Sequence, residues 1–236
     1  MTPPALGLVA LALGAIPLAL LGAVLGLDVV SFPQAMISRP IAAATLAGAL
    51  VGQPAHGLIT GAMLELFALE TLPFGASRYP EWGSASVVGG ALYAVQPVGS
   101  PGALTIAVCA ALITAWVGGW TMVWHRRLIA RWAAGMRGAL AAGSGEAVIA
   151  LQLRGLTSDA VRGGVLTWIA LMAFVPLERA MLARWSFSGA SSRAAVVICA
   201  GAVAGGAIWK LAHNTKGASW FLLGGVAIGS LLLAVT

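Results

Sequence analysis

The chain has 236 residues, of which 60% are hydrophobic and only 8% are charged, and it contains 31 glycines. This balance excludes an ordinary soluble domain, and glycine is more frequent in membrane helices than in soluble ones. The net charge of +6 does not indicate nucleic-acid binding, because most arginines lie beside apolar runs, as in the cytoplasmic loops of membrane proteins. The composition therefore predicts a polytopic all-α protein embedded in a lipid bilayer.

The first apolar run, Ala5 to Leu27, is long enough to cross a bilayer. It lacks the positively charged start and the small-residue cleavage site of a secretory signal, so we expect a retained span. Asp28 ends this run, and Ser31-Phe32-Pro33-Gln34 predicts a break before the next helix.

Two apolar segments that are too short to span come next. As helices, Ile41 to Val51 would rise about 17 Å and Gly57 to Leu69 about 20 Å, against a hydrocarbon core of about 30 Å. The residues between them, Gln53 to His56, predict a turn because they contain a proline. The sequence therefore predicts a re-entrant helical hairpin over about residues 40–70. Since irregular backbone at membrane depth is tolerated where it lines a wet cavity, the polar tip indicates a polar pathway.

The second half of the chain predicts further spans around a basic segment. Ser84 to Val98 is a short run of small residues, and Gly102 to Trp124 is long enough to cross the bilayer. His125 to Arg162 carries six arginines and predicts a cytoplasmic or surface-lying amphipathic loop. Three apolar runs supply the C-terminal spans: Gly164 to Pro176, Ala194 to Trp209 and Ser219 to Val235.

We therefore expect one membrane domain over residues 1–236. Its parts are a first span and break (1–37), the hairpin with a polar loop (38–83), a short run and a span (84–124), the basic loop (125–162) and the C-terminal spans (163–236). Arg179, Arg184 and Arg193 occur in the loop after the basic one, so charge counting along the sequence leaves the orientation open.

The carboxylates of the hairpin carry the strongest functional signal, because an ionised side chain at membrane depth costs several kcal/mol and usually faces a cavity or a partner. Glu65 continues the four-residue spacing of Gly57 and Gly61 and has no evident partner, which predicts a ligand. Glu70 lies roughly 140° further around the helix. Arg39 is as far from the expected tip as Glu70, so these two form a candidate ion pair.

Other polar residues of this region suit the hydroxyl groups of a polyol or sugar. The amide of Gln53 donates and accepts hydrogen bonds. His56 is either a donor to the substrate or a residue of the turn, and Trp82 either stacks on a sugar ring or anchors the chain at the membrane interface.

No catalytic centre is evident in the sequence. It lacks the P-loop pattern, the HExxH motif and a serine elbow in a strand-to-helix setting. Cys109 and Cys199 lie in apolar runs, which predicts neither a disulfide nor a metal site, and no cofactor is expected. An intramembrane enzyme using Glu65 and Glu70 is disfavoured because the two carboxylates lie on different helix faces. A purely structural membrane scaffold is a further alternative.

A set of short motifs runs through and beyond the hairpin: Arg39-Pro40, Thr45-Leu46-Ala47-Gly48, Gly52, Gly57-Leu58-Ile59-Thr60-Gly61, Leu64-Glu65-Leu66, and Gly75-Ala76 before Pro80-Glu81. With these motifs the chain resembles the IIC membrane component of the mannose–fructose–sorbose family of bacterial phosphotransferase-system (PTS) transporters. The likeness is specific over Asp28 to Gly90 and looser beyond it.

The resemblance implies a sugar-conducting subunit of the cell inner membrane. It implies an oligomer with the IID membrane component, served by the cytoplasmic IIA and IIB components, which relay phosphate to an incoming hexose-type sugar. Glu65 falls on the family's Leu-Glu position, and Glu81 falls in a motif like the family's Pro-Pro-Asp. The candidate substrate-binding residues are thus Glu65, Gln53, His56, Glu70, Arg39, Glu81 and Trp82.

The chain departs from the family pattern in three places. Gln53 stands where the family has Asp, Glu70 stands where it has Gly, and Tyr79-Pro80-Glu81 replaces Pro-Pro-Asp. These changes keep a second function open, namely a stand-alone secondary permease for a small polar solute, uncoupled from phosphorylation.

Overall fold

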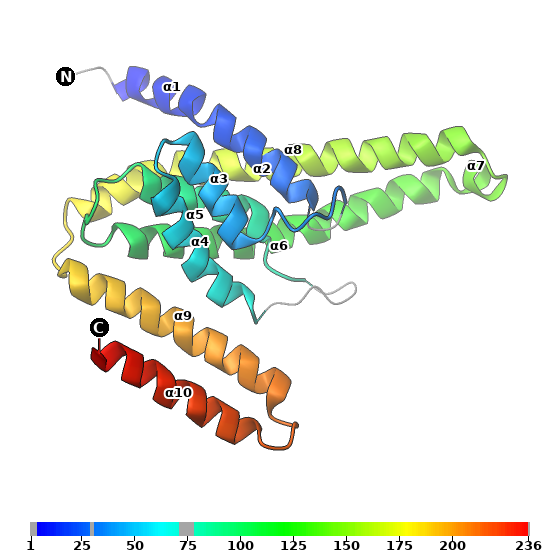
Figure 1. The fold of residues 1–236 in the computed structure, drawn as a ribbon. Coiled ribbons are helices and arrows are strands. Elements are labelled where there is room, and N and C mark those ends of the chain that lie inside the picture. Colours follow the sequence, from blue (N-terminus) through cyan, green and yellow to red (C-terminus); the bar gives the residue numbers. More distant parts are fainter. Residues whose placement is uncertain (1–3, 29–30, 71–77, 236) are drawn as a thin grey trace.

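The computed structural model describes residues 4–28, 31–70 and 78–235, and these form a bundle of ten helices without strands (Figure 1). The predicted all-α fold is thereby confirmed. The helices are α1 (Pro4–Gly14), α2 (Ile16–Asp28), α3 (Pro40–Leu50), α4 (Pro54–Ala68), α5 (Trp82–Ala94), α6 (Ala103–Gly135), α7 (Arg137–Ala141), α8 (Gly145–Leu182), α9 (Gly189–Ala212) and α10 (Ala218–Val235).

Within the described residues, four helical stretches are long and apolar enough to cross a membrane. They are Gly7–Asp28, Ala103–Gly135, Gly145–Leu182 and Gly189–Ala212. The first of them joins α1 and α2 and covers most of the predicted N-terminal span. The short apolar run after Gly164 becomes long enough because α8 begins nineteen residues earlier, at Gly145.

The helical hairpin is formed by α3 and α4, which have 11 and 15 residues. Its turn is shorter and earlier than the sequence predicts. Gly52 adopts a φ of 88°, which glycine tolerates without strain, and Pro54 is the first residue of α4. His56 was expected in the turn but lies within α4, because a proline at the start of a helix does not interrupt it.

Small residues bring the two hairpin helices into backbone contact, as their four-residue spacing predicts. A Cβ atom added to Gly61 would lie 2.7 Å from the carbonyl oxygen of Pro40, and one added to Gly57 would collide with the carbonyl oxygen of Ala44. The third helix of this cluster, α5, approaches the same segment, since a Cβ on Gly90 would lie 2.5 Å from that oxygen. Such close approach is how helices associate in lipid.

We expect the substitution Gly57→Ala to destabilise the protein by about 1–3 kcal/mol, because the added methyl group must separate α3 from α4. Thermal unfolding of the purified protein in detergent measures this effect. Gly201→Ala is the matched control, since no atom outside its own helix turn lies within 4 Å of the added Cβ. Equal melting temperatures for the two variants would contradict the close packing of the hairpin.

Helix α5 occupies the centre of the bundle. In the segment that the sequence shows as a short run of small residues, the structure has a helix of 13 residues that is buried along almost its whole length. It packs against α2, α3, α4, α6 and α8. Alanine, serine and glycine make up more than half of α5, which leaves room for five neighbouring helices at close distance.

The basic segment 125–162, which the sequence predicts to be a cytoplasmic or surface-lying amphipathic loop, is largely helical. Helix α6 continues to Gly135, and α8 begins at Gly145, so the two run side by side beyond the other helices as far as α7 (Figure 1). We call residues 125–161 of this antiparallel pair the basic stalk. The segment contains no proline and is rich in alanine, leucine and arginine, which favour the helix.

Candidate functional site

Glu65 and Arg39 form an ion pair at the open end of the hairpin. The Oε1 atom of Glu65 accepts a hydrogen bond from Nη2 of Arg39, the residue just before α3. The Oε2 atom accepts from the backbone N–H of Ile41, with an N–O distance of 3.2 Å. The predicted pair of Arg39 with Glu70 is therefore wrong. The reason is the earlier turn, since Arg39 and Glu65 both lie thirteen residues from Gly52.

The surroundings of this pair hold the carboxylate in place and leave part of it accessible. The first N–H groups of a helix have no intrahelical partner and attract negative charge, so the start of α3 stabilises Glu65. The side chains are 21% exposed for Glu65 and 37% for Arg39. A carboxylate offers about four acceptor positions and a guanidinium five N–H groups. Both residues thus keep capacity for further hydrogen bonds.

The opposite end of the hairpin carries Gln53 and His56. Gln53 precedes α4, and its side chain is exposed and makes no capping bond. The ring of His56 is buried beside Tyr93 of α5, with 4.5 Å between ring centroids. Its Nδ1 atom has no hydrogen-bond partner in the described part of the chain. Along the axis of α4, His56 is about 14 Å and Gln53 about 18 Å from Glu65.

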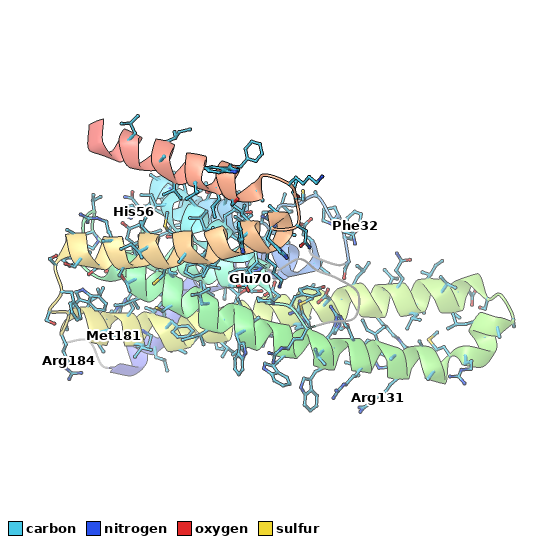
Figure 2. All side chains as sticks on the ribbon, turned by 90° about the horizontal axis from the view of Figure 1, so that it is seen from below. Phe32, His56, Glu70, Arg131, Met181 and Arg184 are labelled. Carbon is cyan, nitrogen blue, oxygen red and sulfur yellow. The ribbon has the colours of Figure 1, made fainter. Side chains whose placement is uncertain are left out.

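The candidate residues therefore lie at both ends of the hairpin, with Arg39 and Glu65 at its open end and Gln53 and His56 at the end with the turn. Figure 2 shows His56 toward the same end as Arg184, whereas Arg131 of the basic stalk lies toward the other. The structure brings Arg39 and Glu65 together but does not bring Gln53 or His56 to them.

The remaining candidates lie around the start of α5. Glu70 is exposed just after α4. Glu81 is completely buried, and its two carboxylate oxygens accept from the N–H of Ser84 at 3.1 and 3.2 Å. It caps α5 in the manner preferred at helix N-termini. Trp82 is half-buried and packs against the apolar core. Gly75 and Ala76 of the family motif lie outside the described residues.

The sequence did not predict a buried polar network that joins Ser31, which lies between α2 and α3, and His125 of α6 to the middle of α8. Arg162 donates from Nε to Oδ1 of Asp159 at 2.8 Å, and the hydroxyl of Ser31 donates to Oδ2 at 2.8 Å. An imidazole nitrogen of His125 lies 3.7 Å from Asp159 and another bonds Ser158 at 2.7 Å. The spacing of three residues between Asp159 and Arg162 on one helix was the available signal.

A second missed contact joins α8 to the loop after α5. Glu178 is fully buried and accepts a hydrogen bond at 3.0 Å from the amide of Gln96. Nothing in the local sequence predicts it, because the two residues are 82 positions apart.

Four helices that are long and apolar enough to cross a membrane, with a short helical hairpin that carries a partly accessible ion pair, are the features of a multi-pass membrane protein. Comparison with family models makes this specific. Residues 12–185 match the family described as the PTS system sorbose-specific IIC component. The chain belongs to this family, which confirms the resemblance seen in the hairpin motifs. No match was found among curated proteins.

The matched range includes the hairpin, α5 and the whole basic stalk, whereas α9 and α10 lie beyond it. Members of the family are transport subunits of the PTS. The chain is accordingly a membrane subunit of a PTS sugar permease.

Proposed function

We propose that this chain is the sugar-conducting IIC subunit of a phosphoenolpyruvate-dependent PTS, and that it translocates a hexose-type sugar for phosphorylation by partner subunits. The observation that carries the proposal is the Arg39–Glu65 pair, which lies on the family's hairpin and is partly accessible.

The pair has the chemistry that a sugar requires. Each hydroxyl group of a sugar both donates and accepts a hydrogen bond. The carboxylate of Glu65 would accept from hydroxyl groups, and the guanidinium of Arg39 would donate to them. The N–H of Ile41 holds the carboxylate of Glu65 in one orientation. The side chain therefore loses little conformational entropy when the sugar binds. Gln53 and His56 would contact the sugar at another stage of its passage, because they lie at the opposite end of the hairpin.

Other subunits would complete the transporter. We expect a IID subunit beside this chain in an oligomeric membrane complex, and cytoplasmic IIA and IIB subunits that carry the phosphoryl group. Many large apolar side chains are exposed on the outer helices, for example Trp220 at 76% and Phe221 at 81%. Lipid and a membrane partner are the surroundings that such a surface requires.

We expect the protein in the inner membrane of the cell. The positions of the basic residues support an orientation in which the basic stalk extends into the cytoplasm. In the fold, Arg184 lies at the end opposite Arg131 (Figure 2). The basic stalk alone carries five arginines, namely Arg126, Arg127, Arg131, Arg137 and Arg154. Short cytoplasmic segments of membrane proteins are enriched in Lys and Arg.

Uptake of labelled hexoses tests this function. In cells that contain the chain, its IID partner and a working phosphate relay, we expect the sugar to be recovered as its phosphate. Uptake should be lost when either the partner or the relay is removed. Accumulation of free sugar without the relay would contradict the proposal and favour the stand-alone permease instead.

A further inference from the structure

A groove lies between α6 and α8, where the basic stalk leaves the rest of the bundle. Its volume is about 440 Å³. Helix α6 contributes Trp124, Arg127, Leu128 and Arg131, and α8 contributes Ser158, Val161, Arg162 and Val165. Within each helix these residues follow the spacing i, i+3, i+4, i+7, so each set forms a single stripe facing the groove.

The accessible charge of the groove is positive. Arg127 and Arg131 are exposed, and neither forms an ion pair within the residues that the structure describes. The nearest carboxylate, Asp159, is 2% exposed and already accepts from Arg162 and Ser31. The accessible cationic capacity therefore belongs to Arg127 and Arg131, which lie one helical turn apart, a spacing that suits a single anionic group.

The other half of the groove is apolar and open to the side. Trp124 is 68% exposed, Val161 58% and Val165 49%. Trp124 is the 22nd residue of α6, about 32 Å from Ala103, so a hydrocarbon core of about 30 Å that begins at Ala103 ends near Trp124. Arg131 lies about 10 Å further along the helix, in the headgroup or aqueous region. The groove is thus apolar at membrane depth and basic just outside it.

From this arrangement we infer that the groove between α6 and α8 binds an anionic phospholipid, with the phosphate held by Arg127 and Arg131 and an acyl chain along Trp124, Val161 and Val165. Basic pockets between membrane helices on the cytoplasmic side are suited to such headgroups. Because half of the groove is apolar and would accommodate an acyl chain, a lipid fits the groove better than free phosphate does. The inference does not depend on sugar transport.

Native mass spectrometry of the full-length protein, purified with any membrane partner that accompanies it, tests the inference. The probes are phosphatidylglycerol, phosphatidylcholine and inorganic phosphate. Because each basic residue near a membrane surface is worth a factor of about five in affinity, the double variant R127Q/R131Q should bind phosphatidylglycerol roughly 30-fold more weakly. The control R137Q/R154Q removes the same charge from exposed stalk positions outside the groove and should bind within twofold of the parent.

Three results would overturn the inference. Equal weakening in both double variants would show general attraction to a basic surface. Binding of phosphatidylcholine as tight as that of phosphatidylglycerol would show an apolar groove without headgroup recognition. Displacement of the lipid by inorganic phosphate at millimolar concentration would show a free-phosphate site.

Discussion

Glu65→Gln is expected to reduce hexose uptake roughly 10- to 100-fold at a sugar concentration below saturation, because hydrogen bonds to a charged group contribute about 1.5–3 kcal/mol. Glutamine keeps the shape of the side chain and an oxygen that can accept from the N–H of Ile41. It loses the charge that pairs with Arg39 and half of the acceptor capacity offered to a sugar. Initial rates of labelled-hexose uptake at equal expression measure the effect.

Two further variants separate binding of the sugar from support of the fold. Glu146→Gln removes one exposed carboxylate from the basic stalk and should leave uptake unchanged. The exchange R39E/E65R keeps an ion pair between α3 and α4 but reverses its direction. If the pair only joins the two helices, the exchange should restore uptake. If the carboxylate contacts the sugar, uptake stays low while the melting temperature recovers, and recovery of uptake would contradict the ligand role.

Asp159→Leu is expected to cause the largest loss of stability, about 3–5 kcal/mol, because it leaves the charge of Arg162 buried without its partner. The side chain of Arg162 is only 8% exposed, and its Nη2 atom already lacks a partner in the described part of the chain. We expect little monodisperse protein on size exclusion in detergent and a lower melting temperature.

A second variant tests whether the loss of stability comes from the unpaired charge of Arg162. The double substitution D159L/R162M removes both charges, so it should recover part of the stability that Asp159→Leu loses. Glu146→Leu, on the same helix but exposed, should change the stability by less than about 0.5 kcal/mol. Stability of Asp159→Leu equal to the parent would contradict the structural role of the network.

The hairpin shows how far the sequence alone could lead. Segment lengths, four-residue spacing of glycines and alanines, and polar residues between two apolar segments were sufficient to predict two short packed helices. The register was predicted wrongly because a proline was taken as part of the turn, whereas Pro54 begins α4. A shift of the turn centre by two to three residues was enough to replace Glu65 by Glu70 as the expected partner of Arg39.

Long-range contacts were beyond prediction for a different reason. The contacts of Asp159 with Ser31 and of Glu178 with Gln96 join residues 128 and 82 positions apart, and only the packing of whole helices sets these distances. For the basic stalk, the arginine content predicted a cytoplasmic or surface-lying segment but not the two long helices that form it. Arginine also favours helices, and α6 and α8 continue through this segment as far as α7.

The most direct test of the central claim is the binding of labelled hexoses to the purified membrane complex by equilibrium dialysis, with the parent, Glu65→Gln and Glu65→Asp compared. We predict saturable binding to the parent, weaker binding to Glu65→Asp, which keeps the charge, and at least tenfold weaker binding to Glu65→Gln. Equal hexose affinity for all three proteins, at equal stability, would contradict the claim that the hairpin carboxylate contacts the sugar.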